Sequence, residues 1–87
     1  RVGQFMVVYA VKNGLNENRY GIVTSKKVGN AVRRNLARRR LREFIRKTDR
    51  GLSQGFDVVL IARTGINSAN FKQIVEEGQQ LLKRLGL

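Results

Sequence analysis

Short hydrophobic runs near the start and in the middle of the chain predict three β-strands. The first run, residues 5–11, is rich in β-branched and aromatic residues, a composition typical of a strand. Residues 19–24 predict a second strand, and the polar turn that Asn13 and Gly14 open predicts a hairpin with a long loop. Residues 57–62 form a third run, which is too short and too β-branched for a helix.

The first strand is apolar on both of its faces. Alternate residues from Phe5 to Val11 are hydrophobic, and so are the residues between them. Such a pattern favours a sheet that is covered on both faces. The alternative is a sheet with one face left open as a binding platform.

Residues 31–48 have the periodicity of an amphipathic helix. Asn30 is a good N-cap residue, and residues 49–51 end the helix. Arg34 projects near the apolar stripe, so we expect it to hang over the sheet. Leu36 lies opposite that stripe, so we expect it to be exposed. The stripe itself occupies one arc of about 100° and consists of Ala37, Leu41, Phe44, Ile45 and Thr48.

A second helix follows the third strand and is predicted to be capped by Asn67 or Ser68. Gly78 lies on its apolar stripe, which indicates a close approach to the sheet, and Gly86 ends the helix. The stripe consists of Phe71, Ile74, Val75, Leu81, Leu82 and Leu85.

The order strand, strand, helix, strand, helix predicts an α+β fold, in which one sheet carries the packed helices. A strand–helix–strand unit lies in its middle. We find no repeat, linker or second domain, so residues 1–87 are predicted to form a single small domain.

Positive charge is concentrated in residues 26–50. This segment holds 11 of the 18 Lys and Arg residues and only two of the six acidic ones, Glu43 and Asp49, so it carries nine of the twelve net positive charges. Like charges recur at i,i+4 in the helix, for example in Arg34, Arg38 and Arg42, and therefore repel one another. A face of this kind needs a polyanionic partner, and its richness in Arg favours nucleic acid. The charge does not distinguish RNA from DNA.

Several chemistries are excluded by composition. The chain has no Cys and no His, which removes disulfides, zinc sites built on these residues and Ser-His-Asp or Cys-His catalysis. No pair of carboxylates is placed for hydrolysis, so we expect neither catalytic nor metal-ligating residues. No apolar run approaches the roughly 20 residues of a membrane span. The absence of Cys fits the reducing cytoplasm, and no protein oligomer is predicted.

A family resemblance is carried by the basic segment. Residues 26–35 read Lys-Lys-Val-Gly-Asn-Ala-Val-Arg-Arg-Asn, and the pairs Arg38-Arg39 and Arg42-Glu43 follow. This sequence closely resembles the signature of the bacterial ribonuclease P protein family, and the strand that begins Phe56-Asp57 is similar to another family segment. The resemblance covers nearly the whole chain.

The resemblance implies a fold and a function. The fold would be like the second domain of ribosomal protein S5, with a mixed sheet and a left-handed β-α-β crossover through the basic helix. The chain would be the protein subunit of ribonuclease P, which removes the 5′ leader from precursor tRNA. The RNA subunit would carry the catalytic Mg²⁺, and the protein would bind no cofactor. Its partners would be that RNA subunit and the leader of precursor tRNA.

The resemblance also implies site residues. Tyr9, Arg34 and Asn35 would line the cleft that binds the leader. The family's N-terminal helix, which brings further aromatic residues to this cleft, has no counterpart in the 87 residues, and Leu36 stands where the motif usually has Arg. The residues expected to bind the RNA subunit are Lys26, Lys27, Arg34, Asn35, Arg38, Arg39 and Arg42.

Three other functions compete with this one. A ribosomal protein of similar fold that binds ribosomal RNA would explain the size and charge, but not the signature. A self-sufficient nuclease lacks the His, Cys or acid cluster that it would need. A membrane-active basic helix would need a free apolar face, whereas Leu41, Phe44 and Ile45 are committed to a core.

Overall fold

A computed structural model describes all residues, 1–87. It contains three strands and two long helices in the predicted order. They are β1 (Met6–Lys12), β2 (Arg19–Val23), α1 (Ala31–Thr48), β3 (Phe56–Ala62) and α2 (Phe71–Arg84), with three short 3-10 turns, η1 (Lys26–Val28), η2 (Asp49–Gly51) and η3 (Ile66–Ser68). The predicted α+β fold is confirmed.

The three strands form one mixed sheet in the order β1-β3-β2. β3 lies between the other two, antiparallel to β1 and parallel to β2. The predicted hairpin of β1 with β2 is therefore wrong. The six residues between β1 and β2 are long enough to pass the start of β3, where Asn13 donates its backbone N–H to the carbonyl of Gly55. Because β3 is apolar from Val58 to Ala62, it gains most from the central position, where both edges are paired.

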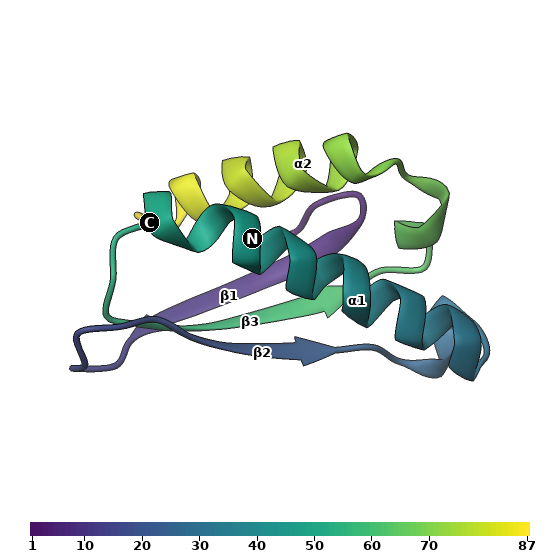
Figure 1. The fold of residues 1–87 in the computed structure, drawn as a ribbon, viewed down its shortest axis with the longest axis horizontal. Helices are drawn as coiled ribbons and strands as arrows, with labels where there is room; N and C mark the ends of the chain where they lie inside the picture. The colour runs from purple at the N-terminus through teal and green to yellow at the C-terminus, as the bar shows by residue number, and fades with distance from the viewer.

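Both helices cover the same face of the sheet, and the other face is open (Figure 1). Met6, Val8 and Leu60 point toward the helices and are fully buried. On the opposite face Tyr9 is 58% exposed and Val11 64% exposed. The expectation of a sheet covered on both faces is wrong, and the open platform is what the structure has. The apolar pattern could not show this, because both helices pack on the same side.

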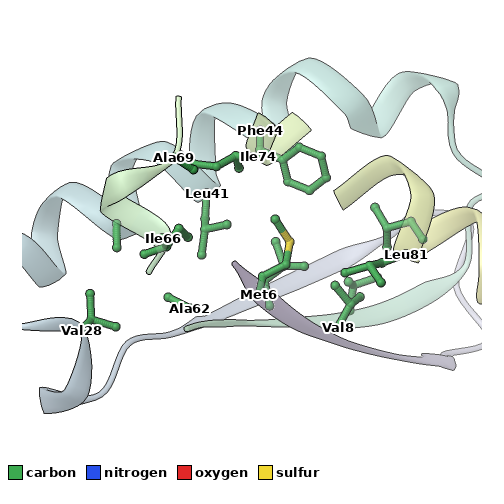
Figure 2. Close-up of a cluster of buried hydrophobic side chains, with 14 residues drawn as sticks. Met6, Val8, Val28, Leu41, Phe44, Ala62, Ile66, Ala69, Ile74 and Leu81 are labelled. Carbon is green, nitrogen blue, oxygen red and sulfur yellow. The ribbon is translucent and has the colours of Figure 1, made fainter. Parts of the chain in front are cut away.

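The core lies between the sheet and the two helices (Figure 2). Phe44 is its largest buried side chain and projects from α1 toward α2. A Cβ atom on Gly78 would lie only 2.3 Å from Cζ of Phe44. The close approach predicted for Gly78 is therefore real, but its partner is α1 and not the sheet. The predicted stripe of α1 is confirmed, since Ala37, Leu41, Phe44 and Thr48 are buried and Ile45 packs against them.

The helix ends follow local capping rules, with one difference from the prediction. Asn30 caps α1 by accepting a hydrogen bond from the backbone N–H of Arg33. Helix α2 is capped by Asn70, which forms a capping box with Gln73, and not by Asn67 or Ser68. Those two residues lie in η3, a turn that buries Ile66 against the core before the helix begins. Gly86, with φ of +95°, follows the end of α2 as predicted.

Candidate nucleic-acid interface

Helix α1 turns one face to the core and presents basic side chains on the rest of its surface. Arg33, Arg39, Arg42, Arg46 and Lys47 are exposed along its length. Two Arg residues occupy its first turn, where the positive end of the helix dipole disfavours cations. The two Arg residues of the first turn therefore do not stabilise the helix through its dipole.

Very few of these cations are neutralised within the protein. Among the basic residues of segment 26–50, only Arg46 forms an ion pair, with Glu43 on the same helix. That hydrogen-bonded guanidinium lowers the pKa of the Glu43 carboxyl. The remaining cations of α1 have no acidic partner within the protein.

A hollow of about 560 Å³ lies on the exposed side of α1. Its walls include Asn35, Arg38, Arg39 and Arg42, so the structure brings together four residues of the predicted RNA-binding set. Arg38 donates a hydrogen bond of 2.8 Å to Oδ1 of Asn35, which fixes its guanidinium along the helix surface. Guanidinium groups held in this way suit bidentate contacts with phosphate oxygens.

Arg34 and the two lysines lie at the beginning of the helix. Arg34 is half-buried and donates a hydrogen bond of 3.1 Å to the carbonyl of Gly29. Lys26 and Lys27 are exposed in η1, directly before α1. They extend the basic surface beyond the N-terminal end of the helix.

Tyr9 is the one predicted site residue that lies in the sheet, whereas the others lie in η1 and α1. Tyr9 is on the open face of the sheet, whereas Arg34 and Asn35 are in the first two turns of α1. No hydrogen bond links Tyr9 to either of them. On its face of the sheet Tyr9 is accompanied by other exposed apolar side chains such as Val11.

Not every basic residue of α1 is available for binding. Arg40 is half-buried and donates hydrogen bonds to the carbonyls of Ile66 and Ala69, which tie η3 to the helix. The Lys47 ammonium lies 5.8 Å from the ring centre of Phe71, over its face. On a helical wheel both cations lie outside the apolar stripe. A helical wheel shows only direction, and these contacts depend on where the chain returns after β3.

Leu36 differs from its predicted exposure. It is half-buried, because η3 packs alongside the first turns of α1. Leu36 lines the wall of the basic hollow and also a second hollow that it shares with Thr64 and Asn67. The expectation of a substantially exposed Leu36 is therefore wrong, although the residue lies outside the main core cluster.

The protein contains no group of three or more His, Cys, Asp or Glu side chains that could hold a metal ion. None of its helices is long and apolar enough to cross a membrane. What the geometry offers is a basic, unpaired helix surface and an open apolar sheet face.

Comparison with known proteins assigns this architecture. The family model of ribonuclease P matches residues 1–86. The ribonuclease P protein component of Caldanaerobacter subterraneus is 43% identical over 97% of this chain and 72% of its own length. That of Syntrophomonas wolfei is 38% identical over 98% of this chain and 71% of its own length.

Solved structures agree with the sequence comparison. The ribonuclease P protein of Thermotoga maritima superimposes with a TM-score of 0.87 at 35% identity, over 97% of this chain and 80% of that one. The Staphylococcus aureus protein gives a TM-score of 0.83 at 31% identity, over 98% of this chain and 78% of that one. With its basic helix, its mixed sheet and these relatives, the chain belongs to the family of bacterial ribonuclease P protein components.

Proposed function

We propose that the exposed basic face of α1 binds the RNA subunit of ribonuclease P. As a member of this family, the chain is an accessory subunit of an endoribonuclease that matures the 5′ end of tRNA. The observation that carries the proposal is the row of guanidinium groups on α1 without acidic partners. Arg38, Arg39 and Arg42 share one hollow there, and the only ion pair of the helix lies elsewhere.

Binding would relieve the repulsion built into α1. Phosphates placed between like-charged side chains at i,i+4 convert repulsion into attraction, and counterions leave the RNA. The chain has no residue set for hydrolysis, so its contribution is to position RNA. We propose that the Mg²⁺ ions required for cleavage are held by the RNA subunit and that the holoenzyme acts in the cytoplasm.

The open sheet face supports a second part of the proposal, binding of the precursor tRNA leader. Tyr9 is exposed there beside Val11 and can stack on an unpaired base, a contact worth roughly 1–3 kcal/mol. Arg34 and Asn35, in the first two turns of α1, would contact the RNA leader where it leaves the sheet face. Lys26 and Lys27 would extend the contact to neighbouring phosphates.

The finer classification of the fold is also a proposal. The parallel pair β2 and β3, joined through α1, supports a fold like the second domain of ribosomal protein S5. We propose that this connection is a left-handed crossover, which is rare because about 98% of such connections are right-handed. A crystal structure that traced a right-handed connection would overturn this assignment.

The RNA-binding proposal is tested by the salt dependence of affinity for a bacterial ribonuclease P RNA. Contact with about six phosphates predicts a log–log slope of roughly −5. Arg38→Ala and Arg39→Ala should each flatten the slope by about one unit, because each removes one phosphate contact. Affinity is measured by filter binding over a range of salt concentrations.

Arg84→Ala is the matched control, since it removes one exposed guanidinium from the last turn of α2. It should leave the slope unchanged. If Arg84→Ala flattened the slope as much as Arg38→Ala, the affinity for RNA would depend only on the net charge of the protein. The basic face of α1 would then not be the contact surface.

A further inference from the structure

A second hollow, of about 340 Å³, lies between the beginning of α1 and the turn that follows β3. The first wall comes from η1 and α1, and the second wall comes from the segment around η3. We call it the η3 hollow, and its lining residues are Val28, Arg33, Leu36, Thr64, Asn67 and Ser68.

The two walls of the η3 hollow are fixed to each other by hydrogen bonds. Nδ2 of Asn67 donates to the backbone carbonyl of Arg33 at 2.9 Å. Arg40 lies about one helical turn after Leu36 and donates hydrogen bonds to the carbonyls of Ile66 and Ala69. The two walls of the hollow are therefore tied together in the fold, as is usual for a preformed site.

The chemistry of the η3 hollow suits a nucleotide. Arg33, Thr64 and Ser68 are exposed at its rim, and they supply one guanidinium and two hydroxyl groups. Leu36 is half-buried and offers an apolar surface between them. None of the six lining residues is acidic. A phosphate, a sugar hydroxyl and the apolar face of a ribose or base would each find a suitable contact.

The side chain of Arg33 leaves the helix close to Gly29, at the edge of the η3 hollow. A Cβ atom on Gly29 would lie 2.6 Å from Cδ of Arg33, so the arginine lies directly over the glycine. Gly29 has φ of +136°, a backbone conformation that disfavours any other residue. The backbone therefore favours glycine at this position, and the absence of a Cβ atom leaves room for the side chain of Arg33 to lie over it.

The η3 hollow adjoins the proposed RNA-binding face. Leu36 lines both this hollow and the basic hollow that contains Arg38, Arg39 and Arg42. An RNA strand bound along α1 could therefore continue past Leu36 into the η3 hollow without leaving the protein surface.

We propose that the η3 hollow is a second RNA-binding subsite, which takes a nucleotide of the ribonuclease P RNA subunit, and this inference rests on the proposed binding of that RNA by α1. Arg33 contacts a phosphate, Thr64 and Ser68 hydrogen-bond the sugar or the phosphate, and Leu36 supports the ribose or base. The RNA footprint thus extends from α1 onto the turn after β3.

The test is a charge introduced at the hollow and matched at a distant site. Ser68→Glu should weaken binding of a bacterial ribonuclease P RNA by about tenfold or more at low salt, because a carboxylate would repel the phosphates. Ser53→Glu is the control. It makes the same change of net charge on an exposed loop before β3, at the opposite end of that strand from Ser68. We expect it to weaken binding less than about threefold. Circular dichroism melts check that both variants fold.

A direct readout is available because the chain has no Cys. A photo-crosslinker attached through S68C should react with one discrete region of the RNA, and one attached through S53C should not. Equal losses of affinity for the two Glu variants, or no crosslink from S68C, would overturn the subsite. If Arg38→Ala also left affinity unchanged, the proposed α1 interface would fail as well. If only the Ser68 results failed, α1 would remain the interface and the η3 hollow alone would be wrong.

Discussion

The two helices lie side by side on one face of the sheet but carry opposite kinds of surface. Helix α2 follows the rules for a stable helix, with a capping box at Asn70, mixed charges along its exposed side and Lys83 and Arg84 in its last turn, where cations are favoured. Helix α1 carries eight basic residues, two of them Arg in its first turn, and only Glu43 is acidic. Its charges repel one another, so its stability must come from packing.

The difference separates support from binding. Glu77 of α2 accepts hydrogen bonds from the backbone N–H groups of Gln4, Phe5 and Met6, which anchors the start of β1. Gly78 of the same helix makes room for the ring of Phe44. Polar and small residues of α2 therefore stabilise the fold through contacts with β1 and α1. Most cations of α1 have no acidic partner, and the packing of Phe44 against α2 stabilises α1 in spite of their repulsion.

The largest expected effect comes from breaking the contact between the two helices. Phe44→Ala should cost about 3–5 kcal/mol of unfolding free energy, because it removes the largest buried side chain and leaves a cavity. In a domain of this size such a loss can unfold the protein. Denaturant melts measure it, and a loss below roughly 1 kcal/mol would show that the packed face of α1 is assigned wrongly.

A double variant tests whether Gly78 is the partner of Phe44. Gly78→Ala alone should destabilise the protein by about 1–3 kcal/mol, because its methyl group would overlap the ring. In the Phe44→Ala background the same methyl group enters the vacated space, so its effect should vanish or become favourable. Strict additivity of the two changes would contradict the contact.

Features set by neighbouring residues were the ones that the sequence predicted well. Helix α1 was predicted with its N-cap at Asn30 and its end at Thr48, because capping and periodicity act over one or two turns. The stripe from Ala37 to Thr48 was correct for the same reason. The signature within residues 26–35 likewise led to the family that the comparisons confirm.

Features set by distant residues were missed. The position of β3 between β1 and β2 depends on pairing between distant parts of the chain, and the apolar sequence of a strand does not indicate which strand it pairs with. The open sheet face was only the alternative to a sheet covered on both faces, because Tyr9 and Val11 are as apolar as buried strand residues. The burial of Leu36 was missed because η3 returns to the side of α1, and a helical wheel of α1 contains no other segment of the chain.

The end of α1 carries a polar network that should be sensitive to acid. Burial opposes the charge of Asp49, but hydrogen bonds from Tyr20, Asn18 and Gln54 outweigh it and hold the pKa of its carboxyl below the ordinary value. A carboxyl with a lowered folded-state pKa stabilises the protein above its unfolded-state pKa, and this stabilisation is lost as pH falls through the folded-state pKa.

Asp49→Asn should therefore cost about 1 kcal/mol at neutral pH, because charge-assisted hydrogen bonds become neutral ones. The gap between variant and parent should close as pH falls below the ordinary range of an aspartate. Urea melts at several pH values measure the gap, and Tyr20→Phe, which removes one of the donors, should reduce it. A gap that stayed constant across this range would assign the cost of Asp49→Asn to packing rather than to charge.

The smallest expected effect on stability is the one that separates folding from binding most directly. Arg38→Glu replaces two like-charged i,i+4 contacts of α1, with Arg34 and Arg42, by attractive ones. Each such pair changes helix stability by about 0.2–0.5 kcal/mol, so the variant should be more stable than the parent by up to about 1 kcal/mol at low salt. The gain should fade as salt rises, because these charges are near the surface. Binding of the RNA subunit should weaken at the same time, since a phosphate contact becomes a repulsion.

The control variant Lys83→Glu makes the same charge reversal on α2, where the basic residue complements the helix end. It should lower stability slightly while leaving RNA affinity nearly unchanged. Both quantities come from urea melts and filter binding on the same preparations. If Arg38→Glu destabilised the protein as Lys83→Glu does, the charges of α1 would serve its folding, and the contrast between a supporting helix and a binding helix would be wrong.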